Sequence, residues 1–184
     1  MPIWLVSFVG MALAVALVGT LLGVAALRLV GRSPQVSGVV LAGLTLFFLA
    51  LTQVPFPDPH TMVCPGVHVT PRLMPFRFLF RAVDLLAVPQ DLPAQLLDRG
   101  PLAALMNLVL CLMIGAALAR WTARGISFAL IWGATLSMGV ELTQLTGFWW
   151  MFPCPWRQFD VDDLILNVGG VVIGFAISRW KKQG

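Results

Sequence analysis

Five stretches of the chain are apolar and long enough to cross a lipid bilayer as helices. A spanning helix needs about 20 mostly apolar residues, and the chain is 59% hydrophobic and only 11% charged. The stretches are Ile3 to Leu27, Val36 to Val54, Pro101 to Ala119, Ile126 to Leu145 and Asp160 to Ser178. The sequence therefore predicts an all-α polytopic membrane protein, folded as a bundle of about five transmembrane helices.

The chain divides into three parts around these helices. Residues 1–54 carry the first two, residues 55–100 form one long proline-rich extracytoplasmic loop, and residues 101–184 form a three-helix core. Within the loop, Phe76 to Val88 places Arg77, Arg81 and Asp84 on one helical stripe and apolar side chains on most of the rest. We expect an amphipathic helix that lies on the membrane surface or re-enters it. Packing of this helix on the bundle is the alternative.

Basic residues predict the orientation of the chain in the membrane. Five helices put the two termini on opposite sides, and basic residues near helix ends favour the cytoplasm. A cytoplasmic C-terminus and an outer N-terminus place seven of the twelve Lys and Arg residues inside, with no acid beside them. The seven are Arg28, Arg32, Arg120, Arg124, Arg179, Lys181 and Lys182.

The last three predicted helices each carry polar and small residues on one face. Offsets of three and four share a face, and the stripes are Asn107, Cys111 and Gly115; Gly133, Ser137, Glu141 and Gln144; and Asp160, Asp163, Asn167, Gly170 and Gly174. A charge facing lipid is costly, so Glu141 needs a partner such as Arg157, a proton or a wet cavity. We expect an outward-facing polar pocket whose ligand-binding residues are Asn107, Glu141, Gln144, Arg157, Asp160, Asp162, Asp163 and Asn167.

Local capping explains part of this cluster. Asp160 is placed as the N-cap of the last helix and Asp163 as its partner three residues later, which is close to a capping box. Capping leaves Asp162 and Glu141 unexplained, and this favours a functional site. The carboxylates would also suit magnesium, calcium or manganese, but their spacing matches no metal motif, so neither a metal nor a cofactor is predicted.

Two of the three cysteines, Cys64 and Cys154, are each followed by proline and fall on the predicted outer face. A disulfide persists in an oxidising compartment, so we expect a bridge that ties the long loop to the segment carrying Arg157 and Asp160. Two free thiols are the alternative, because sequence does not give the Cα separation. Cys111 lies within a predicted helix, where packing is its expected role.

Other functional classes lack support in the sequence. The basic residues are scattered at helix ends without an aromatic platform, so no nucleic acid is expected as a partner. The motifs GxxxxGK[ST], HExxH, CxxC and GxSxG are absent.

Four motifs occur in an order that resembles the VanZ-like family of membrane proteins. They are Arg-Leu-Met-Pro-Phe-Arg at 72–77, Asn107 with its apolar run to Gly115, Glu141-Leu-Thr-Gln144, and the segment from Arg157 to Gly170. The resemblance covers roughly residues 70–178. The chain differs from the family pattern at Leu112 and Met113, where family members commonly have a proline. The helix kink that this proline would produce is therefore not expected here.

The resemblance implies a bacterial cell-membrane protein. A member of the family is associated with low-level resistance to teicoplanin, a lipid-tailed glycopeptide antibiotic. The implied partners are membrane lipids, a lipid-linked cell-wall intermediate or a lipoglycopeptide.

Two other functions are alternatives to ligand binding. One is a membrane enzyme acting on a lipid-linked phosphate, with Glu141 or Asp163 as general base, and the other is a structural subunit whose polar stripes hold helices together. The oligomeric state is not indicated.

Overall fold

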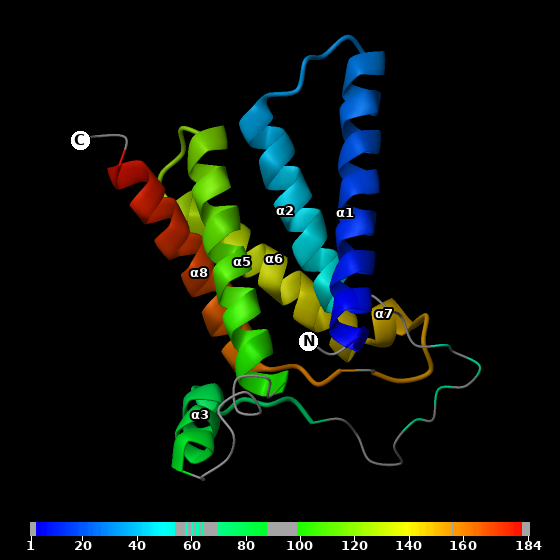
Figure 1. Ribbon diagram of the computed structural model, residues 1–184, viewed down its shortest axis with the longest axis vertical. Coiled ribbons are helices and arrows are strands. Elements are labelled where there is room, and N and C mark those ends of the chain that lie inside the picture. The colour runs from blue at the N-terminus through cyan, green and yellow to red at the C-terminus, as the bar shows by residue number, and fades with distance from the viewer. Residues whose placement is uncertain are drawn as a thin grey trace.

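The computed structural model describes residues 3–53, 58, 60, 62, 64, 70–87, 99–155 and 157–181, with the backbone alone described at 3–5, 81–82, 85–86 and 99–101. These residues form the helices α1 (Ile3–Leu29), α2 (Val36–Gln53), α3 (Arg77–Ala87), α5 (Arg99–Trp121), α6 (Ile126–Leu145), α7 (Gly147–Trp150) and α8 (Val161–Trp180). Five of them are long and apolar enough to cross a membrane (Figure 1). The predicted all-α polytopic fold is confirmed.

The five long helices form two groups. α8 packs along α5 and against α6, while α1 and α2 form an antiparallel hairpin that meets the other helices mainly through contacts of α2 with α5. Figure 1 shows α1 and α2 close together at one end of the hairpin and separating from each other toward the α1–α2 turn, where α2 lies beside α5. The chain termini lie toward opposite ends of the bundle, as five crossings require.

Three glycines let α5 and α8 approach each other closely. A Cβ atom on Gly115 would lie 2.0 Å from the carbonyl oxygen of Val171, and one on Gly174 would lie 2.0 Å from that of Leu112. A Cβ atom on Gly170 would lie 2.8 Å from the Cβ of Cys111. Small residues at the interface are the usual way for membrane helices to gain packing contacts, since lipid supplies little hydrophobic drive. The predicted faces of the third and fifth spans therefore contact each other.

The chain reverses sharply after α6. Gly147 has a φ of 61°, and a Cβ atom there would lie 3.0 Å from the carbonyl oxygen of Cys154. The next three residues, Phe148, Trp149 and Trp150, also have positive φ angles of 52°, 57° and 67°. This backbone region disfavours non-glycine residues by about 1 to 2 kcal/mol each, and no sequence pattern predicted the turn.

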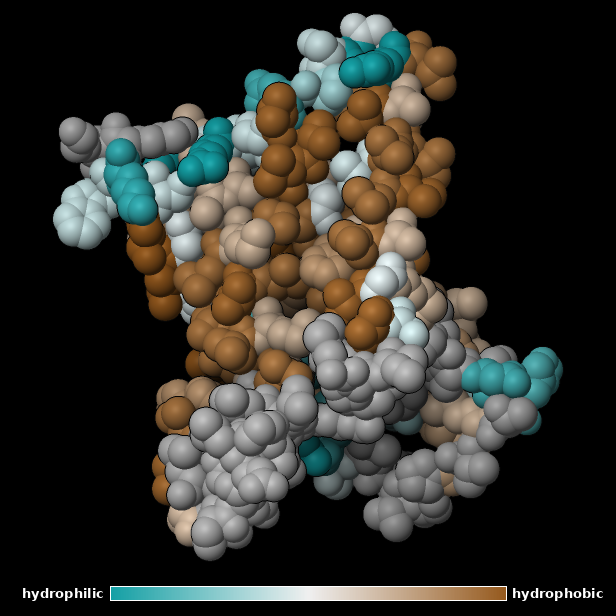
Figure 2. Space-filling view, in the orientation of Figure 1, coloured by the Kyte–Doolittle hydropathy of each residue, from teal (hydrophilic) through white to brown (hydrophobic). Residues whose placement is uncertain are grey.

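Charged residues gather at the two ends of the bundle, with an apolar band between them. Figure 2 shows hydrophobic side chains over the middle and hydrophilic ones at the end with the α1–α2 turn. Of the basic residues assigned to the cytoplasm, all but Lys182, which lies outside the described residues, are at this end, hereafter the basic end. Every described acid lies toward the opposite end. Residues 55–57, 59, 61, 63, 65–69 and 88–98 of the predicted loop also lie outside the described residues.

Candidate functional site

The N-terminus of α8 is capped by two carboxylates from different helices. Asp160 is the N-cap residue, and its side chain accepts a hydrogen bond from the amide N–H of Asp162 (3.0 Å). The amide N–H of Asp160 donates to Oε2 of Glu141 on α6 (2.9 Å). In a capping box this second acceptor is the side chain three residues after the cap, which would be Asp163. The predicted N-cap at Asp160 is confirmed, whereas its predicted partner, Asp163, is wrong: Glu141 takes that place and the Asp163 carboxylate bonds to α5 instead.

The three polar stripes meet below this cap. Oδ1 of Asp163 accepts from Nδ2 of Asn107 on α5 (3.2 Å). One turn deeper, Nδ2 of Asn167 donates to Oγ of Ser137 on α6 (3.0 Å), and its Oδ1 accepts from Sγ of Cys111 on α5 (3.5 Å). Asn167, Ser137 and Cys111 are all buried. Hydrogen bonds between side chains thus connect α8 to both neighbouring helices.

Asp162, which capping of its own helix leaves unexplained, holds the start of α3. The residue is 6% exposed. Oδ1 accepts from the amide N–H of Phe76 (2.5 Å), and Oδ2 accepts from that of Phe78 (3.2 Å). A carboxylate at a helix N-terminus satisfies amide groups that lack partners within the helix. Asp162 therefore anchors the amphipathic helix to the end of α8.

A short extended segment before α3 is paired with the chain entering α8. The amide N–H of Arg72 donates to the carbonyl oxygen of Phe159 (2.8 Å), and its carbonyl oxygen accepts from the amide N–H of Val161 (3.0 Å). The Arg72 guanidinium lies 3.6 Å from Oδ2 of Asp160. The motif at residues 72–77 thus lies directly beside the motif at residues 157–170.

Cys64 and Cys154 form a disulfide, with a Cα–Cα distance of 5.9 Å. The predicted bridge is confirmed, and it joins the loop to the segment between α7 and α8. Cys111 is free and buried.

The two kinds of cysteine should differ in reactivity. In the folded, unreduced protein in detergent, we expect a membrane-permeant maleimide to label none of the three, because two are bonded and Cys111 is 0% exposed. After reduction, two sites should react, and one more after denaturation. Mass spectrometry counts the adducts, and a Cys64→Ser variant should expose Cys154 without reductant. Labelling of Cys64 and Cys154 before reduction would contradict the bridge.

A cavity of about 570 Å³ lies where α3, α5 and the start of α8 meet. Its walls carry both signs of charge together with apolar side chains, so a ligand would meet polar and hydrophobic surface at once. The charged residues are Arg72, Arg77, Asp84, Asp160, Asp162 and Asp163, and the others are Met74, Phe78, Phe80, Ala103, Ala104 and Leu166. We call it the α3 cavity.

The predicted site residues fall into three places. Asp160, Asp162 and Asp163 line the α3 cavity. Behind them, Asn107 bonds to Asp163 and Glu141 to the amide of Asp160, whereas Asn167 lies one turn deeper and bonds to Ser137 and Cys111. Gln144 lies elsewhere, because its Nε2 donates to the carbonyl oxygen of Thr52 on α2 (2.8 Å). Arg157 is exposed, and no ion pair with it occurs among the residues that the structure describes.

Sequence reasoning missed Arg72, Arg77 and Asp84 as members of the site. Both arginines belong to the 72–77 motif, and Arg77 and Asp84 lie on the predicted stripe of α3. The sequence therefore singled out these residues, but it did not show that they lie in the same cavity as the aspartates at the start of α8. Over the described part of the chain, no group of three or more His, Cys, Asp or Glu side chains is arranged to hold a metal ion.

The fold and this site define a polytopic α-helical membrane protein with a polar centre at one end of its bundle. Residues 38–182 match the VanZ/LLP1 family, and the chain belongs to that family. The predicted family is confirmed, and the match begins within α2, well before the predicted start near residue 70. No curated protein and no solved structure matches the chain.

Proposed function

We propose that the α3 cavity binds a lipid-like or glycopeptide molecule at the outer face of a bacterial cell membrane, and that binding contributes to envelope or teicoplanin-type glycopeptide resistance. One observation carries the proposal: the cavity combines arginines, aspartates and apolar walls at one end of a membrane bundle. Ligand cavities have volumes of about 300 to 1,000 Å³. The size of the α3 cavity fits a head group with the start of an acyl chain.

The proposal places the N-terminus outside and the C-terminus in the cytoplasm. Basic residues at the C-terminal end of the bundle support this orientation through the positive-inside rule. The Cys64–Cys154 disulfide at the opposite end supports it too, because such bonds persist in oxidising compartments. The α3 cavity would then face the outer surface, where a lipoglycopeptide or a lipid-linked cell-wall intermediate is found.

The charges of the cavity favour a ligand that carries both signs. The Asp162 carboxylate accepts hydrogen bonds from amides at the start of α3, and Asp160 forms an ion pair with Arg72. These groups therefore already have partners within the protein. Arg77 and Asp84 are exposed on α3, and Asp163 has one hydrogen bond from Asn107. A ligand with an anionic group near Arg77 and an ammonium group near Asp84 and Asp163 would complement this lining.

Loss of the Arg77 charge should weaken ligand binding about tenfold or more. A hydrogen bond to a charged group contributes about 1.5 to 3 kcal/mol, and each 1.4 kcal/mol is a factor of ten in affinity. We would measure binding of teicoplanin and of phosphatidylethanolamine to the full chain in phosphatidylcholine nanodiscs, for the native protein, Arg77→Gln and Asp163→Asn. Lys181→Gln removes one charge at the opposite end and is the control.

Binding of either probe by the native protein, weakened in the two cavity variants and not in the control, would support the proposal. It would be overturned if neither probe binds, or if Arg77→Gln and Lys181→Gln bind equally well. Teicoplanin susceptibility of cells expressing each variant then tests the link to resistance.

The alternative of an enzyme acting on a lipid-linked phosphate has narrower support. Glu141 is 1% exposed, bonded to the amide of Asp160 and not part of the cavity lining, so Asp163 is the remaining candidate for a general base.

The alternative of a purely structural role fits the deeper residues, because Asn167 forms hydrogen bonds with Ser137 and Cys111 within the bundle.

A further inference from the structure

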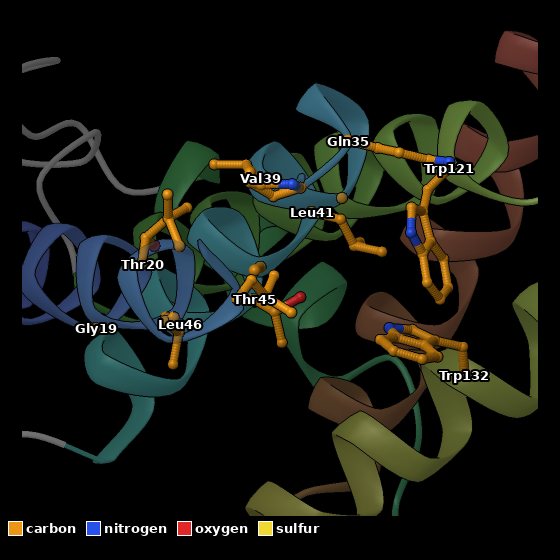
Figure 3. A pocket seen from close by; sticks show the side chains of 15 residues that line it. Gly19, Thr20, Gln35, Val39, Leu41, Thr45, Leu46, Trp121 and Trp132 are labelled. Atoms are coloured by element: carbon orange, nitrogen blue, oxygen red, sulfur yellow. The ribbon is translucent and has the colours of Figure 1, made fainter. Parts of the chain in front are cut away.

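A second cavity, of about 650 Å³, lies near the basic end, away from the α3 cavity. The α1–α2 hairpin forms one wall through residues such as Gly19, Thr20, Gly23, Leu41 and Thr45. Trp121 of α5 and Trp132 of α6 form the other, with ring centroids 6.3 Å apart. Figure 3 shows the two indole rings facing Thr45 and Leu41 across the opening. We call it the hairpin cavity.

Two buried polar atoms on the walls of the hairpin cavity have no hydrogen-bond partner. They are Oγ1 of Thr45 and Nε1 of Trp132. An indole N–H can only donate, and a buried donor without an acceptor is destabilising. The rest of the lining is almost entirely apolar. The cavity is therefore suited to a hydrophobic molecule that carries an acceptor oxygen.

The position of the cavity indicates the source of that molecule. Its lining lies on helices that are long and apolar enough to cross a membrane, and Gly23 and Leu27 of that lining are exposed. A lipid in the surrounding membrane leaflet can therefore enter the cavity laterally, past these exposed residues. Acyl chains match the apolar walls, and the ester carbonyl at the head of a chain is an acceptor.

The charge around the cavity favours one class of lipid. Arg28 follows the lining residue Leu27, Arg120 precedes the lining residue Trp121, and Arg32 and Arg124 lie in the adjoining turns. No Asp or Glu lies at this end within the described ranges. Basic residues near a membrane surface attract anionic head groups.

We propose that the hairpin cavity holds an acyl chain of an anionic phospholipid, with its ester oxygen accepting from Trp132 and its phosphate near the basic end. The site is separate from the α3 cavity, so this inference does not depend on the proposed function. A bound lipid would fill the space that opens where α1 and α2 separate toward their turn.

Gly23 offers a way to fill the cavity without disturbing the helices. A Cβ atom on Gly23 would meet nothing within 4 Å, and Gly23 lines the cavity. Gly10 lies on the same helix, also has nothing within 4 Å, and is not part of this lining. Gly23→Leu is therefore the test variant and Gly10→Leu its matched control. Trp132→Phe removes the donor and keeps a ring, with Trp180→Phe, 78% exposed, as its control.

The experiment uses the full chain in nanodiscs of equal phosphatidylglycerol and phosphatidylcholine, released into the gas phase for native mass spectrometry. We expect the native protein and both controls to retain phosphatidylglycerol in at least fivefold excess over phosphatidylcholine. Gly23→Leu should lose most of this adduct, and Trp132→Phe should reduce it at least threefold. Equal retention of the two lipids, no retained lipid, or equal adducts in Gly23→Leu and Gly10→Leu would overturn the proposal.

Discussion

The Gly174→Ala variant should unfold far more readily than the native protein. The added methyl group would lie 2.0 Å from the carbonyl oxygen of Leu112, and that atom belongs to the backbone of α5, so no side-chain rotation relieves the clash. α5 and α8 would have to separate along their whole contact, which also carries the Asn107–Asp163 bond. Overpacking costs about 1 to 3 kcal/mol where side chains can adjust. We expect a loss of about 3 kcal/mol or more here.

Gly169→Ala provides the control for this variant. Gly169 is on the same helix, and a Cβ atom there meets nothing within 4 Å. Alanine has a higher helix propensity than glycine, by about 1 kcal/mol, so Gly169→Ala should leave stability unchanged or raise it. Thermal unfolding in detergent, followed by circular dichroism and size-exclusion chromatography, separates the two. Similar unfolding temperatures for both variants would contradict the close contact of α5 with α8.

The helices and their shared faces could be predicted because both depend on local periodicity. The predicted Ile126 to Leu145 has the bounds of α6, and the other spans differ at their ends by a few residues. Residues spaced by three and four share a helix face whatever lies opposite them. The stripes containing Asn107, Ser137 and Asn167 were therefore visible before their partners were known, and the structure shows that they face one another.

The partners within the site could not be predicted, because they join segments far apart in the chain. Asp162 accepts from amides 84 and 86 residues away, and nothing local distinguishes it from a second capping carboxylate. A similar separation along the chain lies between the arginines of the 72–77 motif and the aspartates beside which they lie. Gln144 shares a helix face with Glu141, yet one turn is enough to place it against α2. The helix face of a residue predicts the direction in which its side chain points. Which residues form a site depends also on where the neighbouring helices lie.

The Glu141→Leu variant should destabilise the protein by about 2 kcal/mol and weaken ligand binding in the α3 cavity. Leucine has a similar bulk but leaves the amide N–H of Asp160 without its acceptor, and a buried donor left without an acceptor costs about 1 to 3 kcal/mol. The start of α8 would loosen, and with it Asp160, Asp162 and Asp163, which line the cavity. Glu141→Gln retains a carbonyl acceptor, so it should lose less than half as much stability. Unfolding in detergent and probe binding in nanodiscs measure the two effects.

Combining this change with Asp160→Ala tests whether Glu141 acts as the second half of the α8 cap. Removing an N-cap side chain costs about 1 kcal/mol. Once that cap is lost and the first turn of α8 frays, the amide N–H of Asp160 reaches water and the loss of Glu141 costs less. The double variant should therefore be more stable than the sum of the single losses implies, by about 0.5 kcal/mol or more, as expected for residues in one network. Simple additivity, with Glu141→Gln as damaging as Glu141→Leu, would show that Glu141 stabilises the bundle by some route other than the amide of Asp160.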